Sequence, residues 1–558
     1  MRPLSCSLWV ATIAVAALLV CATSVASAAV IHIPADQPTI AAGLAAASPG
    51  DTLLLADGSF YEHGLIISQP VTITSEHGPG YTDINASGSG RHFWVENVDG
   101  AVFRGLSLHQ GLDSWGAAIF ADTSNITIDF CVLGGNHSTY QGGGLVCRGG
   151  TGTFISTNFV SSVADFEGGS VVLDGASGYF TDCYFGNNQS LWGAGVAIYN
   201  AGATPVFDGC DFGENHAVGT EPYGGGVYCW NYASPTFINC RFHDNVSDYG
   251  GGGLMLDENT QAVVTNCSFE NNSAVWGGGI ETWEMLGGTV TGCTFTGNTA
   301  QGGAGVLYEQ SENLVFADCT FSDNVATEAG GGFSLLTSSP GPTNCTFTGN
   351  SAMYGGGMAV AYCTAPVVSD CSFSRNTAMM GGAIAVEMSG SPVVTDCTAA
   401  ENTADYGAGI AFTHCSTPSV SGSTLVLNHA NAEAAGVAVA VGTTLSVERT
   451  IIGFSTAGEA IATDGAPVVC TTTAVYGNLG GDWVGIIAGQ EGSNYNIATD
   501  PYLCGVLEGD YTLCEDSPCL PENNGAGVLV GAYGEGCAGP CGAAVEMKSW
   551  GGIKGMYR

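Results

Sequence analysis

Aromatic and acidic side chains alternate at a nearly constant interval in the middle of the chain. Six residues form this set: Trp230, Asp257, Glu258, Trp283, Glu284 and Glu309. Aromatic faces flanked by carboxylates suit saccharide binding, and closely spaced carboxylates suit Ca²⁺ through oxygen ligands. A solvated strand face tuned for solubility has the same residue types. The six are therefore candidate ligand-binding residues, with a saccharide or calcium as the ligand and a plain solvated face as the alternative.

A second set places a basic side chain between two acidic ones. Asp122, Arg148 and Asp174 follow one another at equal intervals along the chain. Carboxylates beside a basic group are residue types that acid/base catalysis uses. These three residues are the candidate catalytic site.

The intervals belong to a repeat that runs through most of the sequence. Cysteines recur with a fixed period at positions 267, 293, 319, 345, 371 and 397, and each but the last is followed two residues on by Phe and five residues on by Asn. A unit of this length is too short for an independent domain, so each unit must bury its apolar face against its neighbours. The spacing predicts a solenoid of stacked coils.

Each position of the repeat has a physical reason. Cys293 and Phe295 lie two residues apart, so in a strand they share the inward face. We expect Asn298 at a bend, in a left-handed conformation, with its amide bonded to the equivalent Asn above and below. The glycine run that follows makes the next corner. Counting from the last glycine, the fourth residue, Glu309 in this coil, points outward, and both candidate sets occupy that position or the one after it.

The two ends of the array differ from the repeat. Residues 39–47 form the one convincing amphipathic helix, followed by Pro49-Gly50 and a buried strand at 52–55. This order resembles the N-terminal cap of right-handed parallel β-helices of the pectate-lyase-like superfamily. The resemblance implies an all-β, single-stranded right-handed parallel β-helix with a capping helix, and the repeat array of this chain predicts roughly 15 coils. Enzymes of that superfamily cleave or de-esterify acidic polysaccharides.

The repeat itself resembles another family. Phe373-Ser-Arg-Asn376 followed by Gly381-Gly382-Ala383-Ile384 is the clearest instance of motifs found in chlamydial polymorphic outer-membrane proteins. The resemblance covers residues 115 to about 430 and implies a surface-exposed adhesin.

The chain divides into five segments by composition. They are a signal peptide (1–28), an N-terminal cap with irregular first coils (29–115), the regular repeats (116–470), C-terminal coils with a Cys-rich cap (471–541) and a short basic and aromatic tail (542–558). The signal indicates a secreted protein or one on the outer cell surface. The mature chain contains no apolar run long enough for a membrane helix.

The charge balance excludes one class of partner. With 10 basic and 50 acidic residues the formal charge is −40, and nucleic acid binding needs Lys and Arg. Cations and sugars remain as ligands, although a strongly negative surface repels polyuronates. We expect a monomer without a required cofactor, calcium being the one candidate.

The cysteines fall into two classes. Those in the repeat register are expected to be buried free thiols, since parallel stacked side chains do not reach disulfide geometry easily. Disulfides are expected in the cap, among Cys504, Cys514, Cys519, Cys537 and Cys541, with Cys470 as a candidate sixth partner.

Together these features predict a non-catalytic β-helix protein that acts in adhesion or glycan binding through its outer face. The alternative is a polysaccharide-active enzyme, a lyase, hydrolase or esterase, working through Asp122, Arg148 and Asp174.

Overall fold

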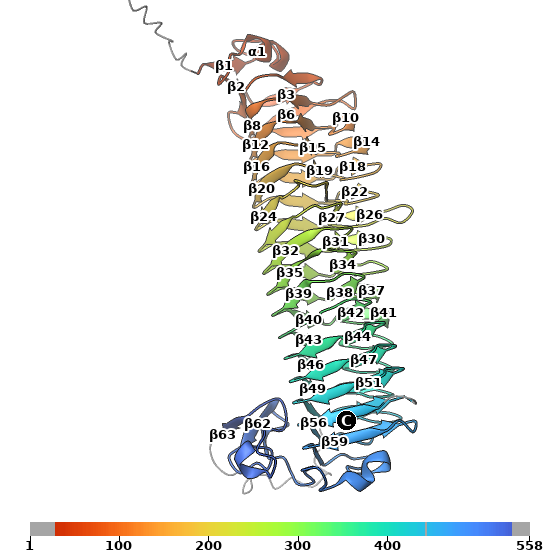
Figure 1. Cartoon of the computed structure of the whole chain (residues 1–558). Helices are drawn as coiled ribbons and strands as arrows, with labels where there is room; N and C mark the ends of the chain where they lie inside the picture. The colour runs from red at the N-terminus through yellow and green to blue at the C-terminus, as the bar shows by residue number, and fades with distance from the viewer. Residues whose placement is uncertain (1–27, 441–443, 538–558) are drawn as a thin grey trace, which may run out of the picture.

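The chain forms a rod of stacked parallel coils (Figure 1). The computed structural model describes residues 28–440 and 444–537. It is an all-β solenoid of about 19 turns, more than the roughly 15 expected. The longest open sheet has sixteen strands, from β4 (Leu65–Ile67) to β58 (Ile461–Thr463), and strands of three further parallel sheets complete the regular coils. The predicted signal peptide, except its last residue, and the predicted tail lie outside the described residues.

One coil shows how the repeat folds. Its strands are β36 (Thr294–Thr296), β37 (Thr299–Gly302), β38 (Val306–Glu309) and β39 (Leu314–Ala317). Phe295 points inward and is fully buried. Its ring stacks on the phenylalanines of the coils before and after at centroid distances of 4.9 and 4.7 Å. A Phe in the same position of successive coils therefore builds a continuous aromatic column in the core.

The asparagines form the expected ladder. Within it, the Nδ2 of each amide donates to the Oδ1 of the next, as from Asn298 to Asn324 at 2.9 Å. The left-handed residue, however, is the one before the ladder position: Gly297 has φ 66° and Asp323 has φ 55°. The expectation that the ladder Asn itself is left-handed was wrong, because the turn needs positive φ one residue earlier so that the amide can point inward. The ladder comprises Asn188, Asn215, Asn245, Asn272, Asn298, Asn324, Asn350, Asn376, Asn402 and Asn428.

The cysteines separate as predicted, with two exceptions, Cys470 and Cys519. Cys519 was expected in a cap disulfide but is a buried free thiol, and Cys541 lies outside the described residues. The in-register cysteines, such as Cys293 and Cys319, lie in the core as buried thiols. Cys504 and Cys537 form a disulfide in the cap. Cys470 was proposed as a cap partner, but it lies on β59 (Val468–Thr471) and is buried in the β-helix core, so that suggestion was wrong.

The N-terminal end is closed by the predicted helix. Helix α1 (Ile40–Ala46) begins after Thr39, whose hydroxyl accepts from the Ala42 N–H at 3.1 Å. The Glu62 carboxylate accepts the N–H groups of Ile40 and the next residue at 2.7 and 2.9 Å. These contacts satisfy free helix-end donors and cover the end of the stack.

At the other end a small sheet folds back beside the rod (Figure 1). It consists of β61 (Leu503–Gly505), β62 (Asp510–Cys514) and β63 (Glu535–Cys537). The Tyr533 and Thr398 hydroxyls lie 2.9 Å apart and join this cap to the coils. Among the described residues no helix has the length and apolar character needed to cross a membrane.

Candidate functional site

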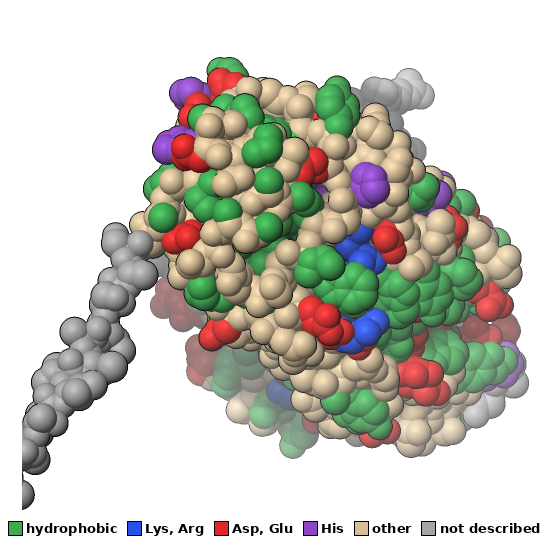
Figure 2. Space-filling model, turned by 90° about the horizontal axis from the view of Figure 1, so that it is seen from above, with side chains coloured by type: hydrophobic (Ala, Val, Ile, Leu, Met, Phe, Trp, Pro, Cys, Tyr) green, Lys and Arg blue, Asp and Glu red, His purple; other side chains and the backbone are tan. Residues whose placement is uncertain are grey.

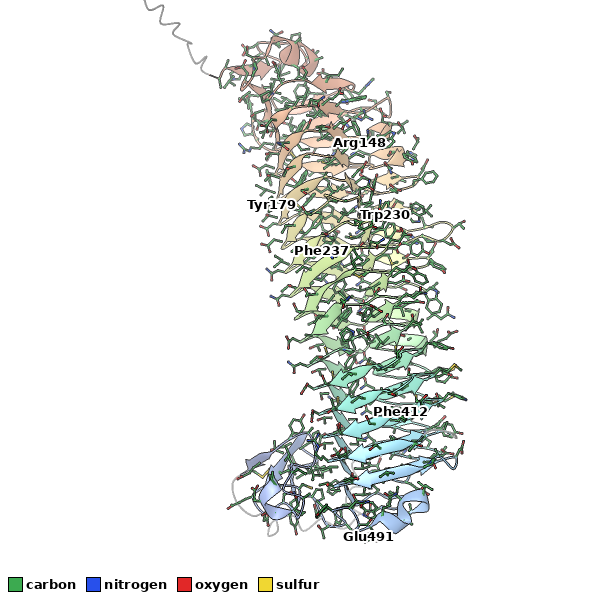
Figure 3. The ribbon with its side chains drawn as sticks, in the orientation of Figure 1. Arg148, Tyr179, Trp230, Phe237, Phe412 and Glu491 are labelled. Carbon is green, nitrogen blue, oxygen red and sulfur yellow. A yellow bond between two sulfur atoms is a disulfide. The ribbon has the colours of Figure 1, made fainter. Side chains whose placement is uncertain are left out.

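The three candidate catalytic residues meet on the outside of the rod. Parallel pairing places Asp122 opposite Arg148 and Arg148 opposite Asp174. Arg148 Nη1 lies 3.8 Å from Asp122 Oδ2, and its Nε lies 3.7 Å from Asp174 Oδ2. Figure 3 shows Arg148 on the same side of the rod as Trp230. Three neighbouring strands carry the trio: β11 (Ile119–Asp122), β15 (Leu145–Arg148) and β19 (Val171–Asp174).

A cavity of about 650 Å³ opens beside Arg148, near the N-terminal end. Arg91, two residues before β7 (Phe93–Glu96), lines it as well and was not among the predicted site residues. Arg91 Nη2 donates to Asp113 Oδ1 at 2.8 Å. Two of the six arginines in the described part of the chain therefore share one pocket.

Both guanidinium groups lie over aromatic rings. Arg91 Cζ is 5.1 Å from the ring centroids of Trp94 and Phe120. Arg148 Cζ is 4.7 Å from the Trp115 centroid and 5.3 Å from that of Phe120. These are cation–π distances, so the two arginines fix the rings that form the pocket walls.

Positive and negative charges nearly cancel around the pocket. Arg91 and Arg148 face Asp113, Asp122 and Asp174. Figure 2, seen from the N-terminal end, shows basic side chains in contact with hydrophobic and acidic ones. The pocket thus presents hydrogen-bonding groups of both signs beside aromatic surface, although the whole chain is strongly acidic.

An aromatic row leads away from the pocket. The Trp115, Tyr140 and Phe166 rings follow one another in successive coils at centroid distances of 5.2 and 5.3 Å. Tyr140 is 39% exposed and Phe166 is 45% exposed. The row therefore offers stacking surface to a ligand that extends along the rod.

Asp122, Arg148 and Asp174 belong to a column of outward-pointing residues, one in each coil, which we call the outward column. A column of residues at the coil corners lies beside it. Trp115, at the end of β10 (Leu112–Trp115), pairs with Gln141, which begins the next coil's corner. Tyr223 pairs with Gly250 and not with the neighbouring Tyr249. This coil has four glycines in a row, and the left-handed one is the second, Gly251. The column continues through Gln141, Glu167, Trp192, Tyr223, Gly250 and Trp276.

Comparison with known proteins identifies the architecture. A family model described as the right-handed β-helix region matches residues 81–242, 219–302 and 278–452. The chain belongs to this family. Metabotropic glutamate receptor-like protein R of Dictyostelium discoideum is 24% identical to this chain over 169 residues, 30% of its length. The match spans only 10% of the length of that relative.

Solved structures similar to this β-helix include an enzyme and an adhesin. Pectate lyase Pel9A is 16% identical, with 46% of this chain and 72% of that chain covered and a TM-score of 0.31. PfbA, a surface adhesin of Streptococcus pneumoniae, is 9% identical, with 66% and 83% covered and a TM-score of 0.20.

The six candidate ligand-binding residues lie further along the β-helix. The Trp230 ring stacks on Tyr199 at 4.3 Å, and Asp257 accepts a hydrogen bond from the Tyr228 hydroxyl at 2.7 Å. Trp283 and Glu309 are direct strand neighbours. The alternating aromatic and acidic residues therefore lie in successive coils on the outside of the rod. Their role in ligand binding stays a prediction.

The two acids that follow the column are placed differently. Glu258 and Glu284 are exposed and left-handed, at φ 22° and 47°. Glu284 lines a separate shallow hollow of about 600 Å³ with Glu312 and Asn313. Among the described residues, one group of side chains that includes carboxylates lies close enough together to share a metal ion. It consists of Asp57, Glu76 and His77, all exposed. The predicted calcium-binding carboxylates are not part of it.

The structure reveals an acid that sequence reasoning missed. Glu281, on β34 (Ile280–Trp283), is 4% exposed, and its Oε2 has no hydrogen-bond partner within the described residues. Burial, followed by the charges of Glu309 and Asp257, raises its pKa well above the usual range. The equivalent position in most neighbouring coils is apolar, as in Met255 and Leu307. In the sequence, an acidic residue at a position that is apolar in most neighbouring coils could have indicated this buried acid.

Replacing Glu281 by glutamine is expected to stabilise the protein at neutral pH. The pKa of Glu281 is higher in the folded chain than in the unfolded chain, where it is about 4.3. Between these two pKa values the carboxyl ionises only in the unfolded chain, which lowers the free energy of that state. The free energy of unfolding therefore falls as the pH rises from about 4.3 towards the folded pKa. Glu281→Gln removes this loss. We expect a free energy of unfolding about 1–3 kcal/mol higher than wild type at pH 7.5, and equal values at pH 4.

Urea denaturation followed by circular dichroism at both pH values checks this. Glu433→Gln, at an exposed acid, is the matched control and should change neither value. A Glu281→Gln variant less stable than wild type at pH 7.5 would contradict the assignment of a protonated carboxyl.

Proposed function

We propose that the arginine pocket and the aromatic row bind an uncharged glycan chain. The observation that carries this proposal is the continuity of the two features, since Trp115 belongs to both. A sugar presents apolar faces to stacked rings and hydroxyl groups to charged side chains. Both kinds of surface meet here.

Charge favours a neutral glycan over an acidic one. The arginines beside the pocket are matched by Asp113, Asp122 and Asp174. The chain as a whole carries a formal charge of −40, so a polyanion is repelled on approach. Neighbouring coils are about 4.8 Å apart, close to the length of one sugar unit. Aromatic rings in successive coils therefore suit successive sugars.

The setting we infer is outside the cell. The signal-like segment at 1–28 and the Phe-x-x-Asn and Gly-Gly-Ala-Ile repeats support a secreted or surface-displayed protein whose glycan binding serves adhesion. This part of the proposal is tested by locating the full chain in fractionated cells with an antibody to the coils.

Glycan binding is tested with the full mature chain on an array that includes neutral and acidic polysaccharides. Trp115→Ala and Tyr140→Ala are each expected to weaken binding about 3- to 10-fold, because one stacked ring is worth about 0.5–1.5 kcal/mol. Affinity for the strongest neutral glycan is then measured by calorimetry.

Tyr179→Ala is the matched control. Tyr179 is 60% exposed and lies on a different side of the rod from Arg148 (Figure 3). Binding that is unchanged in the Trp115 and Tyr140 variants but lost in Trp230→Ala and Trp283→Ala would move the site to the alternating column. Binding to acidic glycans alone would contradict the neutral ligand.

A further inference from the structure

A cluster of metal-binding side chains lies near the N-terminal end of the rod, and none of its members lines the arginine pocket. Strands β2 (Thr52–Leu55) and β5 (Thr72–Ser75) pair in parallel. Asp57 and His77 each lie two residues after one of these strands, so neighbouring coils carry an acid and a histidine at equivalent positions. Glu76 precedes His77 and completes the cluster. Figure 2, seen from this end, shows histidines beside acidic side chains.

Backbone hydrogen bonds hold the two loops that carry the cluster. Gly58, the residue after Asp57, donates its N–H to the Tyr81 carbonyl at 2.8 Å. The Glu76 N–H donates to the Leu55 carbonyl at 3.0 Å. The loops are therefore fixed relative to each other by the stacking of the coils, which lowers the entropy cost of binding a shared ligand.

The three side chains bring one nitrogen and two carboxylates together. One ligand atom from each lies within 4.8 Å of the other two. His77 Nδ1 and Asp57 Oδ1 are 2.9 Å apart, and the Tyr81 ring lies against the His77 ring at a centroid distance of 6.0 Å. Ligand atoms around a tetrahedral zinc ion are about 3.4 Å apart when the metal bonds are about 2.1 Å. Small side-chain movements are therefore enough to form such a site, and the exposure of all three residues leaves room for water on the ion.

The set of ligand atoms favours zinc over calcium. Zinc binds imidazole nitrogen and carboxylate oxygen, usually in tetrahedral coordination. Calcium takes about six to eight oxygen ligands, and this cluster supplies two carboxylates and a nitrogen. Within residues 28–440 and 444–537 no arginine forms a salt bridge with either carboxylate. A bound cation therefore offsets negative charge that no arginine neutralises.

Other histidine–aspartate pairs in the described part of the chain have no third ligand within the same distance. His32, His137 and His216 each pair with one aspartate, at 3.0, 3.0 and 3.1 Å. His243 contacts two aspartates, but through its two different ring nitrogens, so these carboxylates do not face a common ligand atom. Three converging ligands distinguish the cluster after β2 and β5 from these pairs.

We propose that Asp57, Glu76 and His77 bind a zinc ion that joins the first coils of the rod. One ligand comes from the loop after β2 and two come from the loop after β5, so the ion connects neighbouring coils near the end that helix α1 closes. Water completes the coordination. The ligands converge only in the folded chain, so zinc binding stabilises the N-terminal end of the stack. The proposed site is independent of glycan binding.

The experiment titrates zinc chloride into the full mature chain, first treated with a chelator, and measures binding by calorimetry. We expect one zinc ion per chain in the tightest class of sites. Asp57→Asn and His77→Ala should each weaken this binding at least about 10-fold, because each removes one of the three protein ligands. A roughly 100-fold excess of calcium should not displace the zinc. Hydrogen exchange in residues 52–77 should slow on zinc addition in wild type and stay unchanged in both variants.

His32→Ala is the matched control, because His32 is an exposed histidine near the same end with one aspartate partner, Asp36. This variant should bind zinc as wild type does. Absence of zinc binding, undiminished binding in His77→Ala or displacement of zinc by calcium would each overturn the proposal. Loss of binding in His32→Ala would place the ion elsewhere and overturn it as well. Zinc that binds without slowing exchange in residues 52–77 would contradict the joining of the coils.

Discussion

Replacing Asn324 by alanine is expected to destabilise the middle of the rod by about 3–6 kcal/mol. The Oδ1 of Asn324 accepts from the Asn298 backbone N–H and Nδ2 at 3.0 and 2.9 Å. Its Nδ2 donates to the Phe295 carbonyl and to Asn350 Oδ1, both at 2.9 Å. Alanine removes all four bonds. The partners stay buried without them, and each such group costs about 1–3 kcal/mol.

The loss should appear locally before it appears globally, because each coil contacts only its neighbours. Hydrogen exchange followed by mass spectrometry is expected to show faster exchange in residues 293–350, with the terminal coils unchanged. Asn431→Ala is the matched control, since Asn431 is exposed and bonds Asp405 at the surface. Equal exchange in the two variants would contradict a stabilising role for the buried ladder.

Replacing Phe321 by alanine is expected to cost about 3–5 kcal/mol. The ring is fully buried and stacks on Phe295 and Phe347 at 4.7 Å on each side. Alanine leaves a cavity that the stacked strands on either side cannot close, because their hydrogen bonds fix the coil spacing. Phe321→Leu fills most of this space and should cost much less.

Thermal and urea unfolding of both variants, followed by circular dichroism, test the prediction. Phe130→Ala provides a matched control, because Phe130 is 56% exposed. Its unfolding midpoint should stay close to that of wild type. If Phe321→Ala unfolded at the same urea concentration as this control, the aromatic column would not be a source of stability.

Much of the fold was predictable because the same residue pattern recurs in successive coils and folds in the same way each time. Phe295 and Asn298 recur at fixed spacing, so the inward column and the ladder followed from strand alternation alone. The capping helix was predictable from Thr39 and the Pro-Gly sequence that follows it. The errors arose where the left-handed residue precedes the ladder asparagine, as at Gly297, or where a cysteine was assigned by position along the chain, as at Cys470 and Cys519.

The candidate site was predictable only in part. The alignment of Asp122, Arg148 and Asp174 followed from their equal spacing, because parallel coils place equivalent residues side by side. Arg91 lies outside the regular repeat, so no spacing connected it with Arg148.

The sequence by itself determined the stack: which residues face inward, which face outward, and which equivalents in successive coils touch. The repeat period determines this, because residues one repeat apart lie side by side in neighbouring coils and their side chains point the same way. Only the tertiary structure decided which different columns approach one another around a coil. That approach brings Glu167 beside Tyr199 and buries Glu281. Burial and charge at these contacts, rather than residue type, determine which carboxyl groups hold a proton, and so where chemistry is possible on this rod.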